Sequence, residues 1–137
     1  MREELLEQIL GELNGSSADI QASAVISLDG LVMATMLPAG LDPDRVGAMS
    51  AAMLTLGDRT ASELFRGELE QVLVKGSAGY VLMAHAGPEA VVTVLAKSTA
   101  KLGLIFLDVR SACQSIAIAL EPIAQPIMAP PTLRRLA

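Results

Sequence analysis

The chain has 137 residues, enough for one domain with a real hydrophobic core, and a formal net charge of -5 at pH 7. This charge argues against a nucleic-acid-binding protein, which needs a basic surface to neutralise phosphates. Apolar residues make up 52% of the chain and aromatic residues only 2%, so the core must be aliphatic. The mean hydropathy of +0.50 suggests that some apolar surface is reserved for an interface.

Two features of the sequence predict a cytoplasmic protein. Cys113 is the single cysteine, so no internal disulfide can form, which fits a reducing compartment. The first seven residues are charged where a signal peptide would be apolar, and no run of 18 apolar residues occurs. We therefore expect neither a signal peptide nor a membrane span.

The chain opens with a predicted amphipathic helix from Arg2 to Leu13, because its aliphatic residues recur on one face and its glutamates mostly on another. Two strands follow, Ser23–Leu28 and Leu31–Leu37. They flank Asp29-Gly30, a pair that is typical of a tight hairpin turn because both residues tolerate positive φ. Neither strand alternates cleanly, which predicts a sheet that is covered on both faces.

The longest predicted helix runs from Asp42 to Gly67. Asp42 suits the N-cap, Pro43 the first helical position, and Arg66 and Gly67 the end. At 100° per residue, its apolar residues form a stripe and a shoulder that together cover roughly half the circumference, more than one sheet can cover. The stripe consists of Val46, Met49, Met53, Leu56 and Leu64, and the shoulder of Leu54 and Phe65.

Two glycines inside this helix, Gly47 and Gly57, each cost about 1 kcal/mol relative to alanine. Small residues permit close backbone approach, so we interpret them as favouring contact with a second helix, such as the same helix of another copy. The alternative is that both apolar stripes are ordinary core and the glycines are merely tolerated. Periodicity alone leaves open which face of the helix looks inward.

Three further strands are predicted, Leu69–Lys75, Tyr80–Ala86 and Ala90–Lys97, and their short links imply an antiparallel meander. The first has charged or polar residues near its ends, as an edge strand would, and such an edge can pair with another copy. A last helix, Lys101–Leu120, has Ser98 or Thr99 available as its cap. Its apolar stripe consists of Ile105, Val109, Ala112, Cys113, Ile116 and Leu120.

These elements predict an α+β fold with a five-stranded antiparallel sheet, the long middle helix on one face and the two terminal helices on the other. Beyond them, four prolines predict that residues 121–137 form an extended or disordered tail. Apolar residues in this tail offer a way to dock along a groove, although a frayed terminus is the simpler interpretation. They are Ile123, Ile127, Met128 and Leu133.

The same order of elements resembles the Roadblock dynein-light-chain family, in its prokaryotic MglB-like branch. The resemblance rests on residues 24–34, the helix that begins at Asp42, the strand within residues 67–76, and Leu102-Gly103-Leu104-Ile105. It covers residues 4–120, so we take residues 1–120 as a Roadblock-like domain of profilin-like, three-layer α/β/α architecture. Lys101 departs from the small polar residue expected there, which bears on the local helix cap.

The resemblance implies a dimeric platform, homodimeric or heterodimeric, that binds a small Ras-like GTPase and regulates it as a GTPase-activating protein or a scaffold. We expect a homodimer. The dimer-contact candidates are Met49, Met53, Leu56, Thr60, Leu69, Gln71, Leu73 and Lys75. The GTPase-contact candidates are Arg45, Arg59, Glu63 and Arg66.

We expect no enzyme and no cofactor. Ser98-Thr99-Ala100-Lys101 matches the Ser-x-x-Lys pattern of some serine hydrolases, but the companion motifs are missing and the chain is too short for that fold. His85 and Cys113 are too few for a structural zinc site, and His85 is better explained by a hydrogen bond near a turn. No Gly-x-x-x-x-Gly-Lys loop is present, so any GTP chemistry belongs to a partner.

Four arginines are available to reach the transferring phosphate of such a partner: Arg45, Arg59, Arg66 and Arg110. We interpret them as solvated surface charges and expect regulation by positioning the switch segments of the GTPase. The alternative function is a small-molecule-sensing or generic protein-interaction module of profilin-like fold. A sensor is less favoured, because the predicted strands offer few convergent polar groups to orient a ligand.

Overall fold

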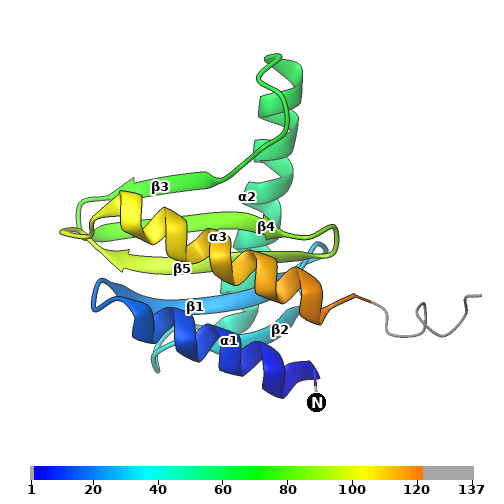
Figure 1. The fold of residues 1–137 in the computed structure, drawn as a ribbon. Coiled ribbons are helices and arrows are strands. Elements are labelled where there is room, and N and C mark those ends of the chain that lie inside the picture. Colours follow the sequence, from blue (N-terminus) through cyan, green and yellow to red (C-terminus); the bar gives the residue numbers. More distant parts are fainter. Residues whose placement is uncertain (1, 122–137) are drawn as a thin grey trace, which may run out of the picture.

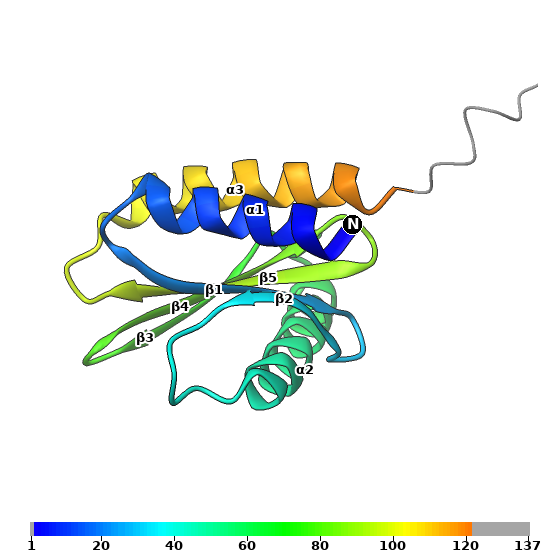
Figure 2. The same ribbon diagram turned by 90° about the horizontal axis from the view of Figure 1, so that it is seen from below.

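The computed structural model describes residues 2–121 and has three layers (Figures 1 and 2). The elements are α1 (Arg2–Ser16), β1 (Ile20–Ser27), β2 (Val32–Met36), α2 (Pro43–Glu63), β3 (Val72–Gly76), β4 (Gly79–Ala86), β5 (Ala90–Lys97) and α3 (Leu102–Ala119). The strands form one antiparallel sheet in the order β2-β1-β5-β4-β3. Helices α1 and α3 lie on one face and α2 on the other, which confirms the predicted fold class. Apart from Glu121, the predicted tail lies outside the described residues.

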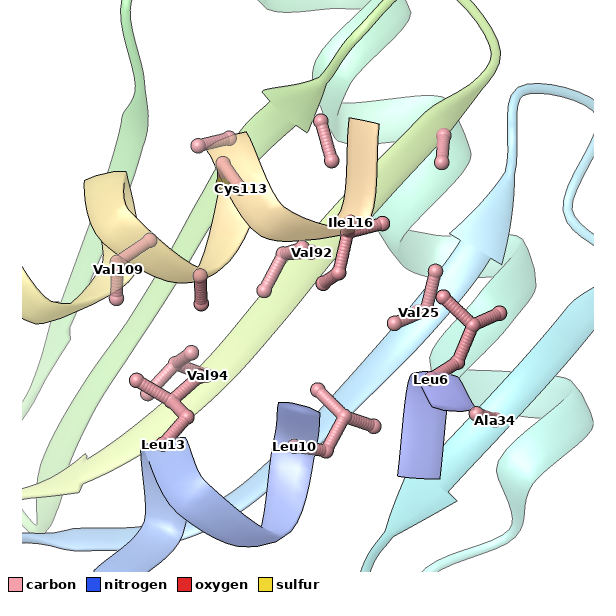
Figure 3. Packing of buried hydrophobic residues seen from close by; sticks show 14 of the residues in the cluster. Leu6, Leu10, Leu13, Val25, Ala34, Val92, Val94, Val109, Cys113 and Ile116 are labelled. Atoms are coloured by element: carbon pink, nitrogen blue, oxygen red, sulfur yellow. The ribbon is translucent and has the colours of Figure 1, made fainter. Parts of the chain in front are cut away.

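The main core lies between the sheet and the pair α1 and α3 (Figure 3). Leu6 and Leu10 of α1 and Ile116 of α3 are buried against Val25 and Val92 of the sheet. The predicted stripe of α3 is buried along its whole length, Cys113 included. Burial raises the pKa of the Cys113 thiol to about 11, because the charged thiolate is poorly solvated there. Cys113 is therefore a core residue, as predicted.

Helix α2 approaches the other face of the sheet through small residues. Thr93 Oγ1 of β5 donates a hydrogen bond of 2.6 Å to Ser50 Oγ of α2, and both side chains are buried. A Cβ on Gly47 would lie 2.7 Å from the carbonyl oxygen of Gly30, and one on Gly57 would lie 2.8 Å from a Val72 methyl. Contacts within the chain thus explain both glycines, and they no longer argue for a second helix.

The inward face of α2 differs from the predicted stripe. Val46, Ser50 and Leu54 are buried, whereas Met49 and Leu56 of the stripe are more than half exposed. The reason is that the inward face contains a polar residue, Ser50, whose hydroxyl is satisfied by β5. Leu54, assigned to the shoulder, belongs to the core instead.

The ends of several elements also differ from the prediction. Asp42 caps α2 as expected, its Oδ1 accepting a 3.0 Å hydrogen bond from the amide of Asp44, but the helix ends at Glu63. Strand β3 begins at Val72 and not at Leu69. The expected cap of α3 by Ser98 or Thr99 is wrong: Lys101 is the N-cap residue and makes no side-chain capping hydrogen bond.

Among residues 2–121, α3 is the one helix that is long and apolar enough to cross a membrane, with a mean hydropathy of 1.5 over its 18 residues. A single helix of this kind is weak evidence, since the core helix of a soluble protein passes the same test. In this fold α3 lies beside α1 and contacts β4 and β5, so one side of it is part of the core.

The buried hydroxyl pair makes a prediction about stability. Replacing one partner, by Ser50→Ala or Thr93→Val, leaves a buried polar group unpaired and should lower the free energy of unfolding by about 1–3 kcal/mol. The double variant removes both polar groups and should lie close to the native protein. Urea unfolding of the native protein, the two single variants and the double variant measures the coupling between the two hydroxyls as a double-mutant cycle. Strictly additive losses would show that the two hydroxyls are not coupled.

Candidate functional site: the groove between α2 and β3

Helix α2 extends beyond the sheet. In Figure 1 it crosses the strands and continues past β3, which is an outer strand of the sheet. Leu64 and Phe65, directly after the helix, are 61% and 88% exposed. Within residues 2–121, β3 pairs only with β4, so its other edge is open. An apolar projection and an unpaired strand edge therefore lie next to each other.

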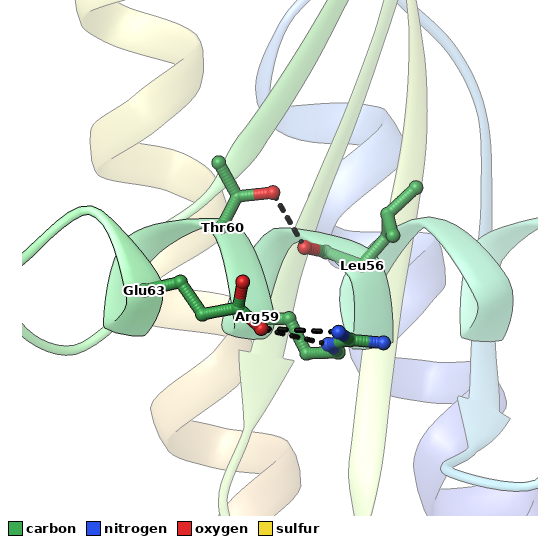
Figure 4. Close-up of polar contacts among 4 residues, drawn as sticks. All are labelled: Leu56, Arg59, Thr60 and Glu63. Atoms are coloured by element: carbon green, nitrogen blue, oxygen red, sulfur yellow. Dashed lines mark hydrogen bonds and ion pairs between the residues drawn. The ribbon is translucent and has the colours of Figure 1, made fainter.

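A groove of about 420 Å³ opens beside this projection, and we call it the α2–β3 groove. It is lined by Met53, Leu56, Gly57, Thr60, Ala61, Leu64, Arg66, Leu69, Gln71 and Val72. Most of these side chains are apolar. The hydroxyl of Thr60 donates a hydrogen bond of 2.8 Å to the carbonyl oxygen of Leu56 (Figure 4), so Thr60 brings no unpaired donor to the groove.

The structure brings five of the dimer-contact candidates together in this groove: Met53, Leu56, Thr60, Leu69 and Gln71. The other three lie outside it. Met49 is exposed further toward the start of α2, and Leu73 and Lys75 are exposed on β3. These positions surround the groove and the open strand edge, but their role as contacts stays a prediction.

Phe65, which the sequence placed on the shoulder of the helix, does not line the α2–β3 groove but lines a neighbouring hollow with Asp58 and His85. It has φ +57°, a left-handed conformation in which Gly is the usual residue. The amide of Arg66 donates to the carbonyl of Ala61 (2.8 Å) and that of Phe65 to Ser62 (3.2 Å), the hydrogen bonds of a Schellman ending. A large, exposed aromatic side chain therefore occupies a backbone position that costs about 1–2 kcal/mol. Gly67, two residues after Phe65, is the reason why the sequence predicted a later end for α2.

The GTPase-contact candidates do not form one cluster. Arg59 and Glu63 pair on an exposed side of α2, with Nη2 and Oε2 3.0 Å apart (Figure 4). Arg45 is exposed in the first turn of the helix. Arg66 instead lines the α2–β3 groove, where its Nε donates to the carbonyl of Leu64 at 3.0 Å.

A second hollow, of about 530 Å³, lies beside Arg59. Two residues of the β1–β2 hairpin, Leu28 and Asp29, line it together with Ala51, Ala52, Thr55 and Leu56 of α2. The sequence predicts this hairpin but indicates no functional role for it. The sequence feature that could have indicated a role for the hairpin is a leucine on each side of its polar turn. These residues, Leu28 and Leu31, are 47% and 67% exposed.

A third hollow, of about 850 Å³, surrounds His85 near the end of α2. His85 Nε2 lies 3.0 Å from both carboxylate oxygens of Asp58, so its partner is on α2 and not in the nearby turn. Nothing in the sequence linked these two residues, which are 27 positions apart. In the described part of the chain, no three His, Cys, Asp or Glu side chains are grouped to hold a metal. The small-molecule alternative stays a prediction.

The family model of the Roadblock/LC7 domain matches residues 5–96, which include most of α1, all of α2 and the sheet up to the last residue of β5. The chain belongs to the Roadblock/LC7 family. Two uncharacterized proteins of Methanocaldococcus jannaschii, MJ1340 and MJ0310, are each 38% identical to it over 112 residues, which cover 82% of this chain and 96% of theirs. The Roadblock domain is generally a non-catalytic adaptor fold.

Solved structures confirm the fold. The Roadblock/LC7 domain from Streptomyces avermitilis has a TM-score of 0.76 at 21% identity, over 83% of this chain and 96% of that one. The gliding protein MglB from Thermus thermophilus has a TM-score of 0.75 at 18% identity, over 86% and 90%. Profilin II from Acanthamoeba castellanii has a TM-score of 0.60 at 17% identity, over 82% and 96%. The resemblance to the Roadblock family and the profilin-like architecture are both confirmed, and the MglB-like branch stays a prediction.

The geometry of Phe65 makes a prediction that separates stability from association. Phe65→Gly relieves the left-handed strain and should raise the unfolding free energy of the isolated chain by about 1 kcal/mol. The same change removes the most exposed apolar side chain, so it should weaken any contact that buries this surface. Urea unfolding of dilute protein measures the first effect. Phe65→Ala is the control, because it removes the ring but keeps the strain. If both variants lose stability equally, the backbone is not strained.

Proposed function

We propose that this Roadblock domain is a non-catalytic platform that forms a homodimer through β3 and α2 and, as a dimer, binds and regulates a small Ras-like GTPase in the cytoplasm. The observation that supports the dimer is the continuity between the open edge of β3 and the apolar α2–β3 groove. The proposal that the partner is a GTPase is supported by the family resemblance and by the exposed charges of α2.

A two-fold arrangement would satisfy both parts of this surface. Antiparallel pairing of β3 with β3 of a second copy would supply the missing backbone hydrogen bonds and continue the sheet across the dimer. The projecting end of α2 would then lie over the sheet of the partner, and the two α2 helices would run side by side. Such a contact is isologous, because the same residues of each copy contribute to it.

The apolar side chains are large enough for a stable association. Leu56, Leu64 and Phe65 are each more than half exposed in the single chain. Burying a fully exposed large apolar side chain contributes roughly 1.5–3 kcal/mol, so these partly exposed side chains, three from each copy, contribute roughly 6–12 kcal/mol. This compares with a cost of about 4–15 kcal/mol for losing translational and rotational freedom. The proposed dimer is therefore energetically reasonable.

A charge inside the groove should break the dimer. Leu56→Asp places a carboxylate at a 59% exposed position that only the proposed contact buries, so we expect a monomer at concentrations where the native chain is dimeric. Leu104→Asp is the matched control, since Leu104 is 58% exposed on α3 across the sheet. Sedimentation velocity of the native chain and the two variants measures their masses in solution. Equal masses for both variants would contradict the assigned interface.

In such a dimer, the outer side of α2 would carry the GTPase contacts. Arg59 and Glu63 are 71% and 64% exposed, and an exposed pair of this kind contributes only about 0.3–0.5 kcal/mol. It can therefore open at little cost when a partner binds. Two copies would place two such pairs on one surface, next to the hollow formed with the β1–β2 hairpin. This surface is suited to the charged and apolar exterior of another folded domain.

We expect regulation without a catalytic arginine. Purified small Ras-like GTPases from the same genome, loaded with GTP or GDP, identify the partner by direct binding and by single-turnover hydrolysis. Arg59→Ala should reduce stimulated hydrolysis by less than about a hundredfold, because a phosphate-contacting arginine supplies on the order of 10³–10⁵. A larger loss, with complex formation intact, would assign Arg59 to the transferring phosphate. Absence of binding to every such GTPase would overturn the proposed function.

A further inference from the structure

Helices α1 and α3 lie side by side over the face of the sheet opposite α2 (Figures 1 and 2). A groove runs between them. The two helices are antiparallel. At one end Arg2 Nη2 donates a hydrogen bond of 2.7 Å to the carbonyl oxygen of Leu120. At the other end Ser16 Oγ donates one of 3.1 Å to Asp108 Oδ2. Any chain that follows Leu120 therefore leaves the fold at the first of these ends.

Two adjoining hollows, of about 330 and 130 Å³, form this α1–α3 groove, and Ile9, Glu12 and Ser115 line both. Its character changes along its length. Near Leu120 it is lined mainly by apolar side chains, with Ile118 67% exposed, together with Gln8, Glu12 and Ser115. Toward Ser16 it is lined by two carboxylates, those of Glu12 and Asp108.

The sequence that follows Glu121 has the complementary order. Residues 122–137 begin with an apolar half that contains Ile123, Ile127 and Met128, and near their end they carry Arg134 and Arg135. This segment contains no Asp or Glu. The segment thus begins apolar and carries its two positive charges only near its end, between Leu133 and Leu136, while the second carboxylate of the groove, Asp108, lies only at its far end.

We propose that residues 122–137 bind in the α1–α3 groove of their own chain, with the apolar residues beside Leu5 and Ile118 and the arginines beside Glu12 and Asp108. The distances allow it. From Ile118 to Asp108 the groove follows α3 for roughly 15 Å at about 1.5 Å per residue. An extended, proline-rich segment of this length spans roughly 50 Å at about 3.1 Å per residue, enough to reverse direction and reach the acidic end.

Charge favours this occupant over a second copy of the domain. The exposed side of α1 carries Glu3, Glu7 and Glu12, and two such faces would bring like charges together. In the proposed arrangement the arginines of the segment would instead oppose Glu12, together with Asp108 of α3. The proposal concerns the face opposite the α2–β3 groove and does not depend on the GTPase partner.

Paramagnetic relaxation in the full chain tests the proposal. A nitroxide on Thr132→Cys should broaden the amide signals of residues 8–12 and 108–115 and leave α2 sharp. Cys113 is buried with a raised pKa, so it stays unlabelled. In the Arg134→Glu/Arg135→Glu variant, the broadening should fall by about fivefold, as expected for the loss of two exposed ion pairs. Adding Glu12→Arg and Asp108→Arg to that variant should restore it.

The matched control adds Arg45→Glu and Arg59→Glu to the native tail, which changes the same amount of charge on α2 and should leave the broadening of the groove unchanged. A sample that mixes isotope-labelled chains with spin-labelled, unlabelled chains should show no broadening. Broadening only in the mixed sample, equal broadening over α2, or no rescue by the double charge exchange would each overturn the proposal.

Discussion

The close approach of α2 to the sheet is the constraint on which the rest of the structure depends. Gly47 lies against the carbonyl of Gly30, and Ser50 is hydrogen-bonded to Thr93, so the first half of the helix is fixed over the inner strands. The helix has 21 residues and spans roughly 31 Å, whereas five strands about 4.8 Å apart span roughly 19 Å between the outermost axes. Because α2 crosses the strands, its last turns must project beyond β3.

This projection divides the molecule into two surfaces with different properties. On the α2 side, Leu56 and Leu64 line an apolar groove next to an open strand edge, and a second copy would cover both. On the α1 and α3 side, the groove is short and changes from apolar to acidic, which suits an extended peptide better than a folded domain. The two proposed contacts would therefore be independent, because the two grooves share no residue.

The sequence predicted those parts of the fold that follow from regular patterns. The stripe of α3, the β1–β2 hairpin and the Asp42 cap are all local signals, and each was confirmed. The inward face of α2 was not predictable, because its contact uses Ser50 and Gly47 and leaves leucines exposed. The left-handed conformation of Phe65 was not predictable, because a left-handed phenylalanine has no sequence signature. The pair of His85 and Asp58 depends on tertiary packing alone, so no spacing pointed to it.

The most direct measurement of the central claim is the mass of the unmodified chain in solution. Sedimentation equilibrium or light scattering at low micromolar concentration should report twice the chain mass of 14.3 kDa, with dissociation only on strong dilution. That result is expected if the projecting end of α2 and the edge of β3 are covered by a second copy. A mass of one chain that persists as the concentration rises would contradict the account, because the apolar projection would then remain exposed to water.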